Sequence, residues 1–442
     1  MITEPEVGKR MFVSDCIEIN EKGHLTVGGC DTVELAHEYG TPLFVYSEDQ
    51  IRRNCRDFVS SIKENYGGHG LALYASKAFC CKRMCRICKE EGMGLDVVSG
   101  GELYTAREAG FPMDKIYFHG NNKTEDELKF AVESGVGRIV VDNIFELETL
   151  DRIARGSGKK IGILLRIKPG IDAHTHNFIR TGQIDSKFGF ALETGEAMDA
   201  VVKALSFTGV ELVGLHCHIG SQIFDIDPFE LAADVMLHFM AKIKQETGRE
   251  LKELNLGGGF GIKYLTSDAP KPFTEYMRRV SKVVKATCQA LGLDMPFILI
   301  EPGRSVVGSA AVTLYTVGGV KHIPNVRIYV SVDGGMTDNP RYILYQSSYE
   351  VMCANKADEP RDTTVTVAGK CCESGDLIQE NAPLQQVEPG DILAVLSTGA
   401  YNYSMASNYN RVPRPAVVMV SDGEPSLAIR RESYGDMIKN DV

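Results

Sequence analysis

The sequence predicts an α/β protein in which a closed (β/α)8 barrel of the TIM type is joined to an all-β domain. Three observations carry this prediction. Short apolar segments alternate with helical segments for more than 250 residues, the alternation ends after Arg304, and the remaining part of the chain contains strand patterns separated by glycine, proline and Asp-Gly turns. Alternating strands and helices are typical of parallel sheets, whereas strands separated by turns are typical of all-β domains.

Length, composition and charge limit the possible classes of protein. A chain of 442 residues exceeds one ordinary core and predicts two domains. The formal net charge of −11, from 48 basic and 59 acidic residues, argues against nucleic acid and anionic membranes as partners. The sequence contains no signal-peptide pattern and no apolar run of the roughly 18 residues that a membrane span requires. We therefore expect a cytoplasmic protein.

The twelve cysteines are expected to be free thiols, because a chain of this size does not need a disulfide framework. Cys81, Cys85 and Cys88 share one face of a predicted helix, which leaves two interpretations, a metal site or packing thiols. No histidine accompanies them, and no second cysteine pair follows at the spacing of a zinc finger. We favour packing and expect no metal.

The first elements are two short strands within residues 9–30, around the turn formed by residues 20–23. A short helix is expected over residues 32–39, because Asp31 can cap its first turn and Gly40 can end it. The composition of the early strands matches that of the C-terminal part of the chain. We therefore assign residues 1–37 and 309–442 to the β domain and residues 38–308 to the barrel.

Eight apolar segments between helices predict the barrel, because near-continuous apolar strands are typical of a parallel sheet covered on both faces. An open doubly wound sheet is the alternative, but it would be expected to carry a Gly-x-Gly-x-x-Gly turn after an early strand, and none is present. The predicted strands are Leu71–Ala75, Leu95–Ser99, Lys115–Phe118, Arg138–Asp142, Ile161–Ile167, Leu212–His218, Glu253–Leu256 and Phe297–Ile300, with helices at 125–134, 143–155, 228–246 and 274–291. The β domain is expected to contain strands at 311–316, 326–332, 363–367, 392–396 and 416–420.

Polar residues follow the predicted strands where active sites of such barrels lie, at the carboxyl ends of the strands. Lys77 follows the first strand and is suited to form an imine with a carbonyl cofactor, although a lysine reaching along the strand to water is the alternative. The glycines of residues 257–261 follow the seventh strand, and Arg304 follows the eighth. Together with Ser221 they predict a phosphate site.

Two further features complete this set. Glu301 ends an apolar strand, where a carboxylate needs a cationic partner such as a protonated pyridine nitrogen. His216 and His218 could point to the same side as a metal pair, or one of them could pack against a flat cofactor. An imine-forming lysine, a phosphate cradle, a carboxylate for a ring nitrogen and a histidine for the ring face are the requirements of pyridoxal 5′-phosphate.

The same residues carry a resemblance to the fold type III pyridoxal-phosphate decarboxylases, which share an alanine racemase-like barrel. It extends from about residue 40 to about residue 420, and within the family the branch that acts on diaminopimelate is the most similar. The matching motifs lie at residues 74–78, 94–103, 216–222, 257–260, 301–304, 339–341, 372–376 and 399–401.

The resemblance implies a role for each matching residue. Lys77 would hold the cofactor covalently until the substrate amine displaces it. His218 would stack on the cofactor ring, and Glu301 would keep its nitrogen protonated. The residues around the phosphate would be Ser221, Gly258, Gly259, Gly303, Arg304 and, from the β domain, Tyr401.

Substrate binding is implied for Arg304, Arg341, Tyr345, Glu373 and Tyr401, and proton donation for Cys372. In this family the residues corresponding to Cys372 and Glu373 come from the partner subunit, so the active site would be complete only in a homodimer. Lys187 would then pair with the partner's Asp376. From the residues alone, a buried packing thiol is the alternative for Cys372.

The implied reaction is decarboxylation of meso-2,6-diaminopimelate to L-lysine and CO2, the last step of lysine biosynthesis. Arg341 and Glu373 favour this substrate, since its distal end carries one carboxylate and one ammonium group. A decarboxylase of ornithine, lysine, arginine or carboxynorspermidine on the same fold stays open, as does a related racemase. A relative without cofactor and a phosphate-binding barrel without pyridoxal are further alternatives. Residues 172–190 are our candidate for the loop that closes over the substrate.

Overall fold

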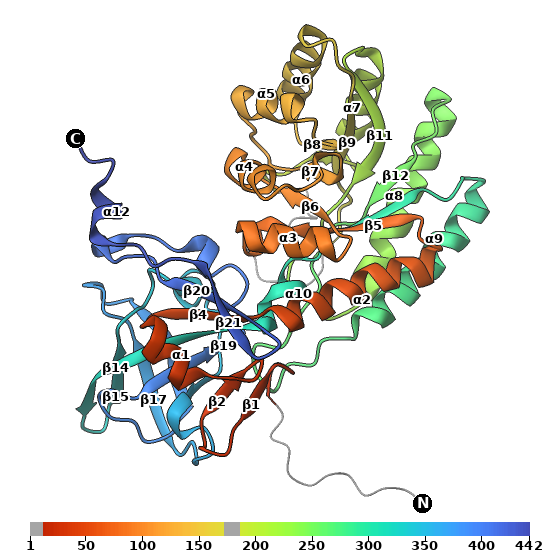
Figure 1. Ribbon diagram of the computed structural model, residues 1–442. Coiled ribbons are helices and arrows are strands. Elements are labelled where there is room, and N and C mark those ends of the chain that lie inside the picture. Colours follow the sequence, from red (N-terminus) through yellow and green to blue (C-terminus); the bar gives the residue numbers. More distant parts are fainter. Residues whose placement is uncertain (1–11, 172–185) are drawn as a thin grey trace, which may run out of the picture. The chain divides into compact units, whose positions relative to one another are not determined.

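The computed structural model describes residues 12–171 and 186–442, and it divides into two compact units (Figure 1). The barrel unit contains Arg52–Ile262 and Pro270–Val306. The β unit contains the described residues up to Ile51, together with Lys263–Ala269 and Val307–Val442. Most of the candidate closing loop, residues 172–185, lies outside the described residues. None of the described helices combines the length and hydropathy needed to cross a membrane.

The barrel unit is a closed ring of eight parallel strands, as the sequence predicts. The strands pair in the order β9-β11-β12-β13-β5-β6-β7-β8, and a further pairing between β8 and β9 closes the ring. All eight predicted strands are present, displaced at their ends by two residues at most. They are β5 (Gly70–Ala75), β6 (Gly94–Val97), β7 (Ile116–Phe118), β8 (Arg138–Val141), β9 (Ile161–Lys168), β11 (Val210–His216), β12 (Glu253–Asn255) and β13 (Phe297–Ile300); β10 (Phe190–Ala191) pairs beside β9.

Helices follow most barrel strands, and several begin on a capping side chain just after the strand ends. Ser99, Thr124 and Asn143 each accept a hydrogen bond from a backbone N–H in the first turn of the helix that follows. These caps explain why the helices begin so close to the carboxyl ends of the strands. The helices are α2 (Glu48–Tyr66), α3 (Lys82–Glu90), α4 (Gly100–Glu108), α5 (Glu125–Ser134), α6 (Ile144–Gly156), α7 (Glu196–Ser206), α8 (Asp227–Thr247), α9 (Phe273–Leu291) and the short α10 (Arg304–Val307).

The β unit is built on a nine-stranded sheet. Seven strands pair in the order β18-β17-β15-β14-β4-β20-β21, while β19 pairs with β14 and β16 pairs with β19. The strands are β4 (Leu43–Ser47), β14 (Ala311–Ile323), β15 (Arg327–Val332), β16 (Val351–Cys353), β17 (Thr363–Ala368), β18 (Leu377–Leu384), β19 (Ile392–Leu396), β20 (Ala416–Ser421) and β21 (Glu424–Ile429). Strands β4, β16, β18 and β21 were not among those predicted.

Strand β4 lies in this sheet, although its residues fall inside the range 38–308 that we assigned to the barrel from the sequence. It pairs antiparallel with β14 and parallel with β20, and all five of its residues are buried. A continuous apolar strand is compatible with either domain. Only its pairing with strands more than 250 residues later decides where it belongs.

The N-terminal strands form a small sheet of their own from β1 (Ile17–Ile19), β2 (Leu25–Val27) and β3 (Cys30–Asp31). The predicted turn before β2 is closed by a backbone hydrogen bond from Gly23 to Asn20. Helix α1 (Thr32–Tyr39) begins where predicted, because the Asp31 carboxylate accepts the N–H groups of Val33 and Glu34. Its apolar face packs into the same core as the large sheet.

Candidate active site

Lys77 stands at the carboxyl end of β5, in the short turn Ser76–Ala78. Its Nζ lies 3.2 Å from Oδ2 of Asp96, which is fully buried in β6. The lysine side chain is 40% exposed, so the amine is paired with a carboxylate and still accessible from solvent. Asp96 can hold this amine in a fixed orientation while the amine stays free to react. A lysine that only extends to reach water would not need such a partner.

Glu301, just after β13, is surrounded by donors from three other strand ends. Asn255 of β12 donates to its Oε1 at 2.7 Å, and His119 Nε2 lies 2.8 Å from the same oxygen. His216 of β11 approaches Oε2 from its Nε2 at 3.3 Å. The carboxylate and both imidazoles are almost completely buried. A buried carboxylate held this way is oriented and remains ionised.

The pKa values in this group follow from burial and mutual charge. Although burial by itself raises the pKa of the Glu301 carboxyl, its interactions with His119 and His216 hold that pKa well below its usual range. Burial lowers the pKa of His216 to about 4, against the opposing effect of Glu301. Burial, together with the charges of Lys77 and Arg166, also lowers the pKa of His218 well below the usual value. His218 is therefore neutral at pH 7 and suited to lie against a flat ring.

The glycine-rich segment after β12 forms a tight backbone cradle. A Cβ on Gly258 would lie 2.1 Å from the carbonyl oxygen of Glu301, and one on Gly259 would lie 2.6 Å from that of Gly220. Gly259 also has a φ of +110°, which side chains disfavour. Only glycine fits these positions, while their part in a phosphate site stays a prediction.

Arg304 and Ser221 lie at the same end of the barrel. Arg304 Nη2 donates to Ser221 Oγ at 2.8 Å, and the Arg304 side chain is buried. Gly303 leaves no room for a side chain, because a Cβ there would meet that of Ala75 at 2.9 Å. Gly258 N–H donates to His218 Nδ1 at 3.3 Å. A buried cation, a hydroxyl and glycine backbone are groups that bind phosphate.

The structure groups different residues from those that we considered as a metal pair. We considered His216 with His218 from the sequence, but His216 instead lies with His119 and Glu301. Among the described residues these three form a set whose possible ligand atoms lie within 4.8 Å of one another. Asn255 donates to Glu301 Oε1, His216 hydrogen-bonds to Oε2, and His119 Nε2 lies 2.8 Å from Oε1, so these contacts account for the arrangement and we assign no metal to it.

Three of the predicted substrate-binding residues, Arg341, Tyr345 and Tyr401, lie together in the β unit. Arg341 begins α11 (Arg341–Tyr345). The guanidinium is buried and donates to the hydroxyls of Tyr264 and Tyr349 and to Ser347 Oγ. Its Cζ lies 5.7 Å from the ring centroids of both Tyr345 and Tyr401. Within the described part of the chain these hydrogen-bond partners are neutral hydroxyls, so the cation can bind an anionic group.

Cys372 and Glu373 lie on an exposed loop between β17 and β18. The Cys372 N–H donates to Asn410 Oδ1, and Glu373 accepts from Gly375 N–H. The Cys372 thiol is exposed, which excludes the buried packing thiol as its explanation. The neighbouring Cys371 differs, because burial and Asp376 raise the pKa of its thiol to about 11.

Asp376 anchors this loop within its own unit. Its Oδ1 accepts from Met336 N–H at 2.6 Å and its Oδ2 from Cys371 N–H at 2.7 Å, and the side chain is buried. The sequence suggested Asp376 as the partner of Lys187 across a dimer. That pairing stays a prediction; within the chain, Asp376 accepts these two backbone N–H groups and Lys187 Nζ lies over the ring of its neighbour Phe188.

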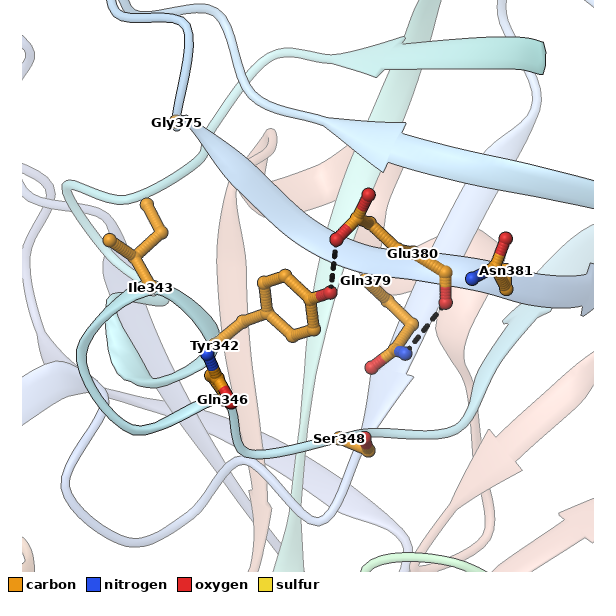
Figure 2. A pocket seen from close by; sticks show the side chains of 8 residues that line it. All are labelled: Tyr342, Ile343, Gln346, Ser348, Gly375, Gln379, Glu380 and Asn381. Carbon is orange, nitrogen blue, oxygen red and sulfur yellow. Dashed lines mark hydrogen bonds between the residues drawn. The ribbon is translucent and has the colours of Figure 1, made fainter. Parts of the chain in front are cut away.

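A pocket of about 570 Å³ in the β unit lies between α11 and β18, beside Gly375 (Figure 2). Figure 2 shows the Tyr342 hydroxyl directed at the Glu380 carboxylate, to which it donates at 2.6 Å. The other Glu380 oxygen accepts from Arg327 at 2.6 Å. Because the charged groups here are paired with each other, we assign no part of the chemistry to this pocket.

Comparison with known proteins identifies the family. The pyridoxal binding domain of pyridoxal-dependent decarboxylases matches residues 48–308. Diaminopimelate decarboxylase of Bacillus methanolicus is 52% identical over 422 residues, which are 96% of this chain and 98% of that protein. The chain belongs to the diaminopimelate decarboxylase family. The Bacillus subtilis diaminopimelate decarboxylase is 50% identical, with 98% of each chain covered. A solved structure of the M. jannaschii diaminopimelate decarboxylase with L-lysine matches with a TM-score of 0.89 at 35% identity, over 98% of this chain and 99% of that one.

The barrel of this family member has groups that fit pyridoxal phosphate. The accessible Lys77 amine can bind an aldehyde, the ionised Glu301 can face a protonated ring nitrogen, and the buried Arg304, which donates to Ser221, supplies a cation that suits a phosphate. The family match and the donor set therefore agree on the cofactor.

Several residues of this diaminopimelate decarboxylase site had no role predicted from the sequence. Asp96 had a usable signal, because it is a charged residue inside an apolar strand, as Glu301 is at the end of one. Asn255 had a weaker signal, as a polar residue at the end of the buried strand β12. Tyr264 had none, since its contact with Arg341 joins segments 77 residues apart.

Proposed function

We propose that the protein is a cytoplasmic, pyridoxal-phosphate-dependent carboxy-lyase that converts meso-2,6-diaminopimelate into L-lysine and CO2, the last step of lysine biosynthesis. The observation that carries the proposal is the 50% identity to a diaminopimelate decarboxylase over 98% of both chains. The Lys77–Asp96 pair and the ionised Glu301 support it independently, because they supply the groups that pyridoxal chemistry requires.

In this proposal the barrel residues hold the cofactor. Lys77 binds it covalently, His218 lies against its ring and Glu301 faces its ring nitrogen. The phosphate is held by Ser221, Gly258, Gly259, Gly303, Arg304 and Tyr401. When bound, the cofactor accepts the electron pair that departing CO2 leaves on the substrate α-carbon.

The residues of the chain then move one proton. The substrate loses one carboxylate as CO2, and the α-carbon gains a proton in its place. We assign this proton to the Cys372 thiol, which is exposed on its loop and therefore available to a substrate. Lys77, whose amine lies 3.2 Å from Asp96, would be the residue that holds the cofactor between turnovers.

Substrate choice is assigned to Arg341, Tyr345 and Glu373, with Arg304 and Tyr401 also facing the substrate. Arg341 is a buried cation whose described partners are hydroxyls, and it suits the distal carboxylate of meso-diaminopimelate. Glu373 suits the distal ammonium. A decarboxylase of ornithine, lysine, arginine or carboxynorspermidine would leave the Arg341 cation without an anionic partner.

A substrate panel tests this assignment. We expect release of CO2 from meso-diaminopimelate with equimolar L-lysine, and at least about 100-fold lower kcat/KM for ornithine and L-lysine, because each lacks the distal carboxylate. Arg341→Met should raise KM for meso-diaminopimelate, while Arg327→Met, which removes a cation of the same unit outside the proposed site, should not. Equal or faster turnover of ornithine would refute the substrate assignment.

The proposal includes a homodimer in which Cys372 and Glu373 serve the active site of the partner subunit. Lys77→Ala and Cys372→Ala should each be nearly inactive alone. Mixed after reversible dissociation, they should recover about a quarter of the native activity, because half of the dimers then carry one intact site. If size measurements show that subunits exchange and activity stays absent, the two residues act within one subunit and the shared site is wrong.

A further inference from the structure

His119 lies between two buried carboxylates of the barrel site. Its Nε2 is 2.8 Å from Glu301 Oε1 and 3.8 Å from Asp96 Oδ1. Asp96 is the residue that pairs with Lys77 through its other oxygen. One imidazole therefore connects the lysine end of the site to the carboxylate that faces the cofactor ring.

The backbone around His119 is fixed by buried hydrogen bonds. The His119 N–H donates to the carbonyl oxygen of Val97 at 2.8 Å. Four residues later, the fully buried Lys123 donates to the carbonyl oxygens of Gly120 and Val140 and to Glu146 Oε1, at 2.8 to 2.9 Å. The loop thus holds its histidine in one place before any cofactor or substrate arrives.

Two buried carboxylates close to each other require positive charge or hydrogen-bond donors nearby. Lys77 supplies the positive charge for Asp96. In the proposed function, however, the same amine binds the cofactor. Neither Asp96 Oδ1 nor His119 Nε2 makes a hydrogen bond of good geometry among the described residues, yet Nε2 lies within ion-pair distance of both Asp96 and Glu301. On the other side, His216 is 3.3 Å from Glu301, so His119 is the nearer imidazole.

We propose that His119 is a positioning residue that keeps Glu301 ionised and aimed at the cofactor ring nitrogen, and that couples this carboxylate to the Asp96–Lys77 pair. The inference rests on the proposed role of Glu301. His119 acts through Glu301 and needs no contact with the substrate. Its contribution therefore depends on the presence of the ring nitrogen.

The test compares His119→Leu with His119→Gln, whose amide N–H can take the place of the imidazole Nε2–H. His238→Asn is the matched control, because that histidine is exposed on α8. Each holoenzyme is prepared with pyridoxal phosphate and with the carbocyclic analogue in which carbon replaces the ring nitrogen. The readouts are kcat, KM, the dissociation constant of each cofactor form and the thermal unfolding midpoint.

With pyridoxal phosphate, His119→Leu should lower kcat about 10- to 100-fold with little change in KM, the size of effect expected for a group that orients a functional residue. His119→Gln should recover most of the loss, and His238→Asn should match the native protein. With the carbocyclic analogue, the native protein and His119→Leu should have the same kcat. An equal loss with both cofactor forms, or no loss with either, would overturn the proposal.

Two further measurements distinguish a failure of the His119 proposal from a failure of the proposed function or of folding. The ratio of the dissociation constants for the two cofactor forms is measured without substrate, so it tests His119 even if meso-diaminopimelate proves not to be turned over. His119→Leu should reduce this ratio toward one. If His119→Leu does not fold, His119→Asn replaces it, because its shorter amide does not reach Glu301, and an unchanged ratio in that variant would refute the role.

Discussion

Lys77→Ala is expected to abolish CO2 release, with kcat reduced about 10⁴- to 10⁶-fold, the range found when the covalent group of an active site is removed. The variant lacks the amine at the end of β5 that can form an imine with an aldehyde. It also leaves the buried Asp96 carboxylate without its lysine. Cofactor affinity should therefore fall together with activity.

The measurement is a single-turnover assay of CO2 release, accompanied by the absorption spectrum of the bound cofactor. The long-wavelength band of the covalently bound form should be absent in Lys77→Ala. A small primary amine added to the solution should restore part of the activity, because it can take over the bond-exchange step. Lys82→Ala is the matched control, since Lys82 is exposed at the start of α3 and should have native activity. A Lys77→Ala protein with native turnover would exclude pyridoxal chemistry at this lysine.

Glu301→Gln is expected to lower kcat about 10²- to 10³-fold, the usual effect of removing one preorganised electrostatic partner of the reacting group. Burial would raise the pKa of this carboxyl, but His119 and His216 hold it well below its usual range. Glu301 is thus an anion throughout the neutral pH range and can keep a ring nitrogen protonated. An amide of the same shape has no charge and cannot.

The check on Glu301→Gln is kcat with pyridoxal phosphate and with the carbocyclic analogue, measured beside Glu211→Gln. Glu211 lies on the same barrel, in β11, but is exposed. Glu211→Gln should be native, and Glu301→Gln should lose activity only with the cofactor that has a ring nitrogen. A comparable loss with both cofactors would mean that Glu301 supports the fold of the site rather than the ring.

The barrel site concentrates buried charge to a degree that an ordinary core avoids. Asp96, Glu301 and Arg166 are all buried within one unit. Arg166 lies over the ring of Phe188 and 3.8 Å from Asp142, and burial lowers its pKa. Each of these groups has a partner of opposite charge or a hydrogen-bond donor nearby, which is the condition under which buried charge is tolerated. Such a cluster departs from core packing rules, and departures of this kind occur at functional sites.

Local information in the sequence was sufficient to predict the barrel and to place Lys77, Glu301 and Arg304 at the ends of its strands. The eight strands were found from their apolar runs, because parallel strands covered on both faces have no polar side to obscure them. The helix caps Asp31 and Thr124 act within their own first turns. Lys77, Glu301 and Arg304 were found because strand ends in such a barrel converge on one face, so position along the chain already implies position in space.

Pairing between distant segments decided the remainder. Strand β4 belongs to the β sheet through its registers with β14 and β20, which no local pattern encodes. Arg341 hydrogen-bonds to Tyr264, which lies 77 residues earlier in the chain. His119, Asp96 and Glu301 lie at or just after the ends of three different strands, and only the closed barrel brings them together. The sequence alone therefore determined the barrel with its eight strands and the chemical groups that follow them, such as Lys77, Glu301 and Arg304. Tertiary structure decided which groups touch, because a hydrogen bond needs a partner within about 3 Å, and that distance is set by the packing of the whole unit.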